Sequence, residues 1–188
     1  MIQSKIDYLY YLDEDRKALG LERKRLRLVG NEIWKYQRLL RRVEYLENNS
    51  APFSKLLLLW VKFRKRKWAF RLGYEISSKT FGPGLAIMHR GPIIILDSVR
   101  IGANCRIHAC VNIGSTKGTG KGAIIGDNCY IGPGVQIVGP VSIADNVTIG
   151  AGSVVTKSFL EPGIVVAGVP AEIIKRKNQK DLESREKE

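Results

Sequence analysis

Residues 125–160 divide into the six-residue units IGDNCY, IGPGVQ, IVGPVS, IADNVT, IGAGSV and VTKSFL. Each unit begins with an aliphatic residue, and in most of them the fifth residue is small or β-branched. The same phase occurs upstream in ILDSVR, IGANCR and IHACVN, which begin at residues 95, 101 and 107. A six-residue period matches neither the 3.6-residue period of an α-helix nor the alternation of a single strand. The pattern therefore predicts a short strand followed by a tight corner, repeated many times.

Three such units close one triangular coil, with the aliphatic residues stacked inside and the corner residues in unusual backbone conformations. Stacked coils pair each strand with the coil above and the coil below, so only the two ends of the stack need a cover. We therefore predict a mainly β fold, a parallel β-helix of hexapeptide repeats. An α-helical N-terminal region covers one end, and the basic tail from Lys175 to Glu188 covers the other.

The N-terminal part of the chain has a helical pattern instead. Apolar residues at helix-like spacing predict helices over about 4–19, 31–47 and 55–71, with Asn31 as the N-cap of the second. The predicted domains are a helical N-terminal region at 1–72, a β-helix domain at 73–177 and a charged C-terminal tail at 178–188.

The chain of 188 residues carries a net charge of +13. Its first 72 residues contain 18 Lys and Arg against 8 Asp and Glu. Such an excess suits an anionic partner, such as nucleic acid, an anionic membrane face or a phosphorylated ligand, or simply a basic surface. No recognised nucleic-acid motif is present, so we predict no nucleic-acid partner.

Two further patterns concern the location of the protein. The longest apolar run, Leu56 to Val61, is far shorter than the roughly 20 residues that cross a bilayer. The N-terminus also lacks the layout of a signal peptide. We expect a cytoplasmic protein that at most lies peripherally on the inner face of the membrane.

The three cysteines have a simple interpretation. Cys105 and Cys129 occupy the small inward position of their units, which indicates core packing, whereas Cys110 does not and has no assignment. An odd number of cysteines argues against a disulfide framework. The two histidines have no Cys or carboxylate cluster at ligand spacing, so we predict no metal site.

Several segments resemble the left-handed β-helix acyltransferases. Within that group, GLAIMHRGPIII at 84–95 is similar to the stretch that carries the catalytic histidine in serine acetyltransferases. The resemblance covers about residues 73–177 and implies an enzyme that moves an acetyl group from acetyl-CoA to a hydroxyl. The N-terminal half is also similar to acetyltransferases of capsule or exopolysaccharide synthesis. The other matching segments are VNIG at 111–114, IGPG at 131–134, IGAGS at 149–153 and AGVPA at 167–171.

Acyl transfer to a hydroxyl needs a base that takes the proton, and the ordinary pKa of histidine, near 6.5, suits this role. The chain has two histidines. His89 interrupts the aliphatic pattern in a Gly/Pro-flanked stretch, and the resemblance makes it the general base; the alternative is a buried, merely hydrogen-bonded histidine. By the same resemblance, Glu75 is the carboxylate that orients it, although a solvated glutamate at a domain junction is the alternative. His108 is a tentative substrate contact.

Two departures from the serine acetyltransferase pattern concern the acceptor. An acidic residue that helps to hold the serine amine precedes the catalytic histidine in those enzymes, but this chain has Met88, also a tentative substrate contact. Their second histidine, in the loop after the Gly-rich stretch, has no counterpart in KGAI at 121–124. Both losses weaken recognition of a small zwitterion. We expect a sugar hydroxyl in surface polysaccharide synthesis; the alternatives are L-serine for cysteine biosynthesis and a non-catalytic β-helix binding protein.

The resemblance also implies a homotrimer, in which CoA lies along the outside of the coils between two subunits. The segment at 115–122 lacks the order of a phosphate-binding P-loop, and we expect it to close over the bound substrates. The basic helix at 55–71 either contacts an anionic membrane face or is buried at the trimer end with snorkelling basic stems. The residues implied in CoA binding are Gly114, Ser115, Thr116, Gly132, Pro133, Ala151, Lys157, Lys175 and Arg176.

Overall fold

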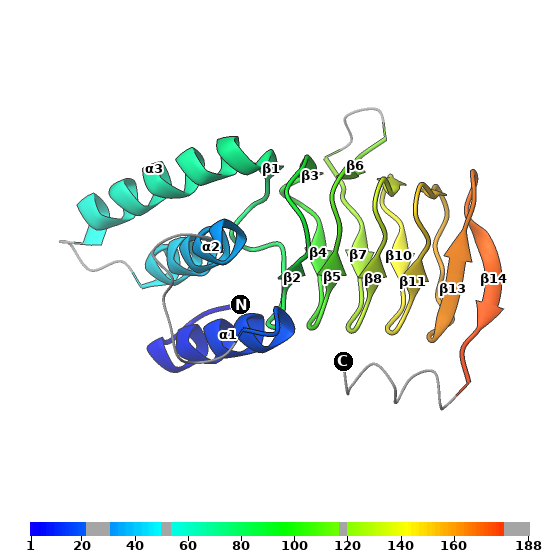
Figure 1. Cartoon of the computed structure of the whole chain (residues 1–188), viewed down its shortest axis with the longest axis horizontal. Helices are drawn as coiled ribbons and strands as arrows, with labels where there is room; N and C mark the ends of the chain where they lie inside the picture. The colour runs from blue at the N-terminus through cyan, green and yellow to red at the C-terminus, as the bar shows by residue number, and fades with distance from the viewer. Residues whose placement is uncertain (22–30, 50–53, 117–119, 179–188) are drawn as a thin grey trace.

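The computed structural model describes residues 1–21, 31–49, 54–116 and 120–178. Within these residues, three helices precede a stack of short strands, and the helices lie together at one end of the stack (Figure 1). The predicted helices are confirmed, with bounds that differ by one or two residues. They are α1 (Lys5–Ala18), α2 (Glu32–Asn48) and α3 (Ser54–Leu72).

The strands form three sheets, with the orders β1-β3-β6-β9-β12, β4-β7-β10 and β2-β5-β8-β11-β13-β14. All pairings are parallel except the last, β13 with β14. Successive coils thus place each strand beside a strand of the next coil, which confirms the left-handed parallel β-helix (Figure 1). The strands are β1 (Tyr74–Glu75), β2 (Ala86–Ile87), β3 (Ile93–Ile95), β4 (Arg100–Ile101), β5 (Arg106–Ile107), β6 (Val111–Gly114), β7 (Ile124–Ile125), β8 (Tyr130–Ile131), β9 (Gln136–Val138), β10 (Ser142–Ile143), β11 (Thr148–Ile149), β12 (Val154–Val155), β13 (Ile164–Ala167) and β14 (Glu172–Arg176).

The first residue of each hexapeptide points into the stack. Ile107, Ile131 and Ile149 align across neighbouring strands and are fully buried. Each such side chain stabilises the fold by about 1.5–3 kcal/mol through burial alone. Cys105 and Cys129 are 1% exposed, which confirms that they are core residues.

The fourth residue of several units forms the corner. Asn104, Asn128 and Asn146 have φ of 55°, 55° and 61°, the left-handed region that asparagine tolerates better than most residues. Cys110 has a φ of 63° at the same place in IHACVN, so the unassigned cysteine is an exposed corner residue. The unusual corner conformations predicted from the repeat are therefore confirmed.

Polar side chains from α1 and α2 cover the open edge of the first coil. Arg41 is fully buried, donates to the main-chain oxygens of Phe81 and Gly82 at 2.7 and 2.6 Å, and pairs with Asp15 at 2.8 Å. Asp15 accepts a hydrogen bond from the Leu85 amide at 2.9 Å. Without these partners the buried main-chain groups would be unsatisfied, at a considerable cost in free energy. The helical region thus covers this end of the stack, as predicted.

Gln37 from α2 also forms hydrogen bonds to backbone groups of this edge, at Leu85 and Ile87. Its amide nitrogen donates to the oxygen of Leu85 at 2.7 Å, and its amide oxygen accepts from the Ile87 amide at 3.4 Å. Both backbone groups belong to the edge of β2, which pairs with β5 on its other side only. The edge strand is therefore held by side chains where no further strand follows.

The start of α2 differs from the prediction. Asn31 does precede the helix, but its φ of 55° places it in the left-handed region, and its side chain makes no capping hydrogen bond. A side chain caps a helix from an extended conformation, which Asn31 does not adopt. Ser4 has that conformation before α1, where it forms a capping box with Asp7.

The far end of the stack is covered by β14, which pairs antiparallel with β13 and includes the first residues of the predicted basic tail. The rest of that tail, residues 179–188, lies outside the described residues. Helix α3 ends at Leu72 and β1 begins at Tyr74, beside the predicted boundary, and the division into domains stays a prediction. None of the described helices is long and apolar enough to cross a membrane.

Candidate active site

His89 lies at the corner that follows β2, with its side chain exposed to solvent. The buried Tyr74 of β1 donates a hydrogen bond from its hydroxyl to the main-chain oxygen of His89 at 2.9 Å. Tyr36 of α2 packs against Tyr74 edge-on, at 5.1 Å between ring centroids. Among the described residues the imidazole of His89 has no hydrogen-bond partner, so the corner is fixed while the ring remains available to a substrate.

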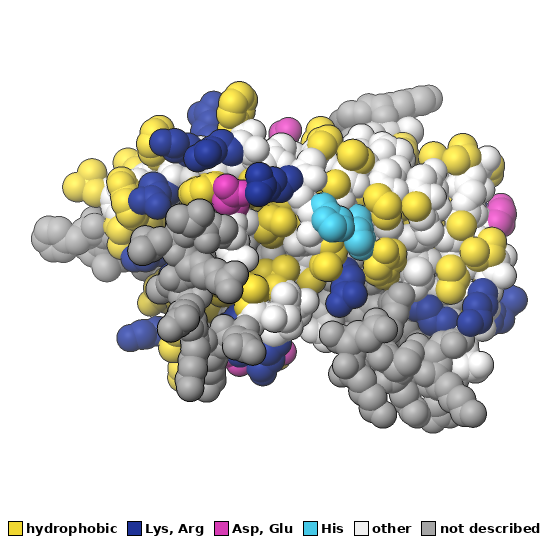
Figure 2. Space-filling view, in the orientation of Figure 1, with side chains coloured by type: hydrophobic (Ala, Val, Ile, Leu, Met, Phe, Trp, Pro, Cys, Tyr) yellow, Lys and Arg dark blue, Asp and Glu magenta, His cyan; other side chains and the backbone are white. Residues whose placement is uncertain are grey.

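His108 and Tyr130 continue from His89 along the same face. The ring centroids of His89 and His108 are 5.5 Å apart, and those of His108 and Tyr130 are 5.1 Å apart. The parallel pairing of β2, β5 and β8 brings these segments side by side. The three rings are diagonal neighbours, because the register places Tyr130 opposite Arg106 and His108 one residue past the Ile87–Ile107 pair. The two histidine side chains lie next to each other on the molecular surface in Figure 2.

The pKa of His108 is lowered below its ordinary value of 6.5. Partial burial is the main cause, and the neighbouring His89 and Arg106 contribute in the same direction. His108 is therefore neutral at neutral pH and can both donate and accept a hydrogen bond. It does not place a second positive charge beside His89.

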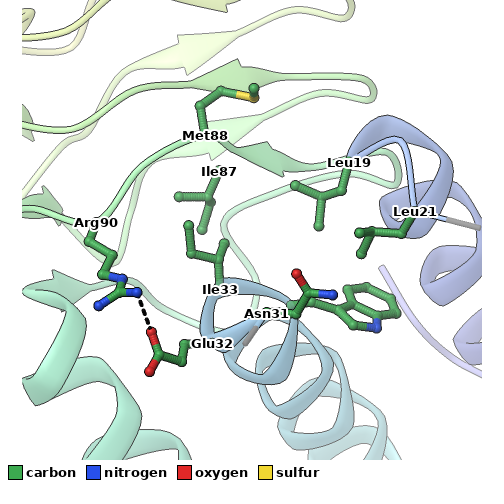
Figure 3. Close-up of a pocket in the computed structure, with 9 residues that line it drawn as sticks. Leu19, Leu21, Asn31, Glu32, Ile33, Ile87, Met88 and Arg90 are labelled. Atoms are coloured by element: carbon green, nitrogen blue, oxygen red, sulfur yellow. Dashed lines mark ion pairs between the residues drawn. The ribbon is translucent and has the colours of Figure 1, made fainter. Parts of the chain in front are cut away.

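A cavity of about 270 Å³ lies between the corner that follows β2, the chain just after α1 and the start of α2. Met88 and Arg90, the residues on either side of His89, both line it (Figure 3). Arg90 forms an ion pair of 2.9 Å with Glu32 at the start of α2. The other lining residues are largely apolar: Leu19, Leu21, Asn31, Ile33, Trp34 and Ile87.

Glu32 is the one carboxylate among the described residues that line this cavity. Its ion pair with Arg90 leaves no unpaired acid there to hold an ammonium group. The cavity can therefore take a small, mainly uncharged group close to the segment that carries His89, although His89 itself is not among the lining residues. An amino acid would have to compete with Arg90 for Glu32.

Glu75 is not brought to His89 by the described structure. It is exposed on β1, and it lines a second cavity of about 380 Å³ together with Lys62, Lys65 and Arg66 of α3. Successive side chains of a strand point to opposite faces, so Tyr74 points inward and Glu75 outward. No hydrogen bond joins Glu75 to His89, and its orienting role stays a prediction.

Tyr74 is the residue at this corner that sequence reasoning missed. The alternation of the strand could have indicated it, because the residue before an exposed Glu75 has to point the other way. What the pattern could not indicate is that the inward side chain reaches the backbone of His89, fifteen positions later.

Most of the residues implied in CoA binding lie on the outside of the stack. A Cβ at Gly114 would meet only the Asn112 side chain, at 3.9 Å, so a ligand could approach this backbone closely. Ser115 and Thr116 follow it directly, before residues that lie outside the described ranges. Pro133 and Ala151 are exposed at successive corners.

Gly132 has a different reason for being glycine. It is buried, and a Cβ there would lie 2.8 Å from the main-chain oxygen of Ile149 in the next coil. Close stacking of the coils therefore requires the glycine, and the expectation that it permits approach of CoA does not follow from this geometry. A part in CoA binding stays a prediction for Gly132.

The three basic candidates lie at the far end of the stack and are exposed. The ammonium of Lys157 contacts both carboxylate oxygens of Glu172 at 2.7 Å, and Arg176 pairs with Glu161 at 2.7 Å. Lys175 is exposed on β14. Exposed ion pairs are weak, so these cations could exchange their partners for phosphate groups. The described residues contain no group of three or more His, Cys, Asp or Glu that could hold a metal ion.

Comparisons with known proteins show which families the sequence and the fold resemble. Residues 122–157 match the family described as bacterial transferase hexapeptide (six repeats). A serine acetyltransferase from Buchnera aphidicola subsp. Schizaphis graminum is 37% identical over 113 residues, which are 57% of this chain and 43% of that protein. The chain thus spans less than half the length of this curated relative.

Solved structures resemble the chain over most of its length. The serine acetyltransferase of Neisseria gonorrhoeae has a TM-score of 0.73 at 25% identity and covers 96% of this chain and 72% of its own. The serine acetyltransferase of Brucella abortus, in complex with coenzyme A, has a TM-score of 0.71 at 22% identity and covers 93% and 70%. The resemblance to serine acetyltransferases therefore includes the N-terminal helices as well as the coils.

Proposed function

We propose that this chain, which resembles the serine acetyltransferases in sequence and in fold, transfers an acetyl group from acetyl-CoA to a hydroxyl. The observation that carries the proposal is the position of His89. Its imidazole is exposed and has no hydrogen-bond partner within the described part of the chain, its backbone is fixed by Tyr74, and its two sequence neighbours line a cavity.

In the proposed reaction His89 acts as general base. It removes the proton of the acceptor hydroxyl as the oxygen attacks the thioester carbon. A carbon–oxygen bond forms, the carbon–sulfur bond breaks, and His89 returns the proton to the leaving sulfur. His108, neutral and 5.5 Å away between ring centroids, can hydrogen-bond to the acceptor without repelling the imidazolium of His89.

L-Serine is the acceptor that the relatives support best, because the similar proteins described above are named serine acetyltransferases. The cavity of about 270 Å³ that Met88 and Arg90 line is large enough for a small amino acid. Glu32 is the group that could hold its amine, after exchange of its partner Arg90. This reading replaces the sugar hydroxyl as the first candidate.

A sugar hydroxyl, as in surface polysaccharide synthesis, is the second candidate. It is favoured by the lining of the cavity, in which Met88 stands beside His89 and Glu32 is already paired. A neutral hydroxyl acceptor needs no unpaired carboxylate, so it fits the described lining without a rearrangement.

We further propose that the chain works as a homotrimer, with acetyl-CoA along the outside of the coils in a groove between two subunits. Gly114 offers open backbone on that surface, and the exposed cations at the far end of the stack suit the phosphates. Three equivalent grooves follow from cyclic symmetry.

The test is release of CoA thiol from acetyl-CoA by the chain and by His89→Ala, with L-serine and with a panel of sugars. Because Cys110 is exposed, both proteins carry Cys110→Ser, so that the thiol reagent detects CoA only. Turnover with serine that His89→Ala loses establishes the first candidate, and turnover with a sugar alone establishes the second. Absence of turnover with every acceptor overturns the proposal and favours a non-catalytic binding protein.

A further inference from the structure

The outer face of α3 exposes an unusual number of large apolar side chains. Phe70 is 90% exposed, Leu56 is 79% exposed and Phe63 is 66% exposed, and Leu59 and Trp60 are also exposed. An exposed apolar patch of this kind marks an interaction site more often than a random surface feature. We call these five residues the outer stripe.

The outer stripe is continuous along the helix. At 100° per residue, its five members fall within an arc of about 100°. The opposite side of α3 is the one that packs on α2, where Val61 is fully buried against Val43 and Leu46. Contacts among the described residues therefore account for the inner side of α3 and leave the outer stripe exposed.

Basic residues line both edges of the outer stripe. Lys55, Lys62 and Arg66 follow one edge, and Arg64 and Arg71 follow the other, with Lys67 within the stripe. Helix α3 contains no acidic residue. Lys62 pairs with Glu47 of α2, and the guanidinium of Arg64 lies 5.0 Å from the ring centroid of Trp60. Figure 2 shows Lys, Arg and hydrophobic side chains intermixed over the region of α3.

We propose that the outer stripe lies on an anionic membrane surface. The aromatic and leucine side chains would enter the boundary between headgroups and acyl chains, while the basic rows contact the lipid phosphates. The long stems of Lys and Arg allow the charges to reach the headgroups beside a buried apolar stripe. The proposal concerns binding only, so it stands or falls independently of the acetyl-transfer proposal.

A two-fold contact with a second copy of the chain fits this face less well. In such a contact the same patch meets itself, so the basic rows of two α3 helices would lie opposite each other. No carboxylate on α3 could compensate that repulsion. The charge of the face complements lipid phosphates instead. The contacts of a cyclic trimer do not pair α3 with itself, and the measurement of oligomeric size below distinguishes that case.

Helix α1 provides a built-in contrast. It exposes Ile6, Leu9 and Tyr10 at helical spacing, but it carries three basic against four acidic residues. Its apolar stripe therefore lacks the charge that an anionic surface selects. If hydrophobicity alone determined lipid binding, α1 and α3 would contribute equally.

The experiment is sedimentation of the full chain with vesicles of phosphatidylglycerol mixed with phosphatidylcholine, and with pure phosphatidylcholine. We expect binding to the anionic vesicles at low salt and a loss of most binding at about 1 M salt, where the Debye length is about 3 Å. Phe63→Ser combined with Phe70→Ser is expected to weaken binding at least about tenfold. The matched control, Ile6→Ser with Leu9→Ser on α1, is expected to bind like the unmodified chain.

Charge and insertion are tested separately. Arg66→Gln with Lys67→Gln is expected to weaken binding several-fold, whereas the control Lys5→Gln with Lys121→Gln leaves it nearly unchanged. Tryptophan emission is expected to shift to shorter wavelength on the vesicles, and Trp60→Phe removes most of that shift, because Trp60 is the exposed tryptophan of the stripe.

Three results overturn the proposal. They are absence of sedimentation at low salt, equal binding to neutral vesicles, and equal loss of binding for the α1 and α3 variants. A change in oligomeric size for Phe63→Ser with Phe70→Ser, measured by light scattering and unaccompanied by lipid binding, assigns the face to a second copy instead. Circular dichroism confirms that each exposed-residue variant remains folded.

Discussion

The hydroxyl of Tyr74 donates a hydrogen bond of 2.9 Å to the main-chain oxygen of His89, and so joins the first strand of the stack to the corner that carries the candidate base. The bond acts on the backbone and leaves the imidazole free. Tyr74 is thus a positioning residue, and its effect on turnover can be separated from its effect on stability.

Tyr74→Phe removes this hydrogen bond and is expected to cost about 1 kcal/mol of the free energy of unfolding. We expect kcat to fall several-fold while KM for acetyl-CoA stays constant, because the base is less well placed but the cofactor surface is unchanged. Tyr36→Phe is the matched control, since the buried Tyr36 hydroxyl has no partner among the described residues. Equal kinetic effects of the two changes would contradict a positioning role for Tyr74.

His108 makes stability depend on pH. Since its pKa is lowered from 6.5 by burial, the folded chain binds fewer protons than the unfolded chain just below that pH. The free energy of unfolding is therefore expected to decrease as the pH falls from about 6.5, until His108 is protonated in the folded state as well. Urea unfolding across this range measures the slope, and His108→Gln is expected to reduce it; an unchanged slope would argue against this assignment.

The pKa of His108 also depends on the neighbouring His89. Because His89 helps to lower the pKa of His108, His89→Ala is expected to raise that pKa, while burial keeps it below the ordinary value. The chain has two histidines, so proton NMR can follow His108 alone in the variant. A pKa that does not change would show that the rings are further apart in solution than 5.5 Å.

The buried pair of Arg41 and Asp15 is expected to be essential for stability. Asp15→Asn removes the carboxylate that pairs with Arg41 at 2.8 Å in a fully buried site and leaves only Glu44, 4.0 Å away, which is expected to cost about 3–5 kcal/mol. Denaturant unfolding measures this loss. Glu161→Gln, which breaks the exposed pair with Arg176, is the control and is expected to have little effect.

The inward and outward positions of the coils predict opposite sensitivities. Ile131→Ala opens a cavity in the stack and is expected to cost about 2–5 kcal/mol. Ile124→Ala, at a position 62% exposed on β7, is expected to change stability by less than about 0.5 kcal/mol. Thermal unfolding compares the two, and similar losses would mean that the phase of the repeat is wrong.

The phase of the hexapeptides predicted which residues are inside, because it assigns the first and the fifth place of each unit to the interior. Ile107, Ile131 and Cys129 are all buried where the pattern placed them. The same phase also explains Cys110, which occupies the fourth place of IHACVN, as Asn104 and Asn128 do in their units. Local repetition was thus sufficient for the fold.

The candidate site was less accessible to sequence reasoning, since its contacts join distant parts of the chain. The proximity of His89 and His108 depends on the parallel pairing of β2 and β5, and the main-chain oxygen of His89 is held by Tyr74, which lies on a different strand. Gly132 is required by the stacking of the coils alone, so a glycine in the repeat does not by itself indicate a contact with CoA. The sequence does not indicate which side of α3 is exposed, because that depends on the packing of α2 against the opposite side.

A stack of parallel coils has no intrinsic end, since every terminal strand is a template for another. Asp15, Gln37 and Arg41 occupy the backbone groups through which the first coil would otherwise accept a strand from a different molecule. The helices therefore close this end of the stack, while β14 covers the other. A chain that loses them would expose one unpaired edge next to the candidate base and would be expected to associate through that edge.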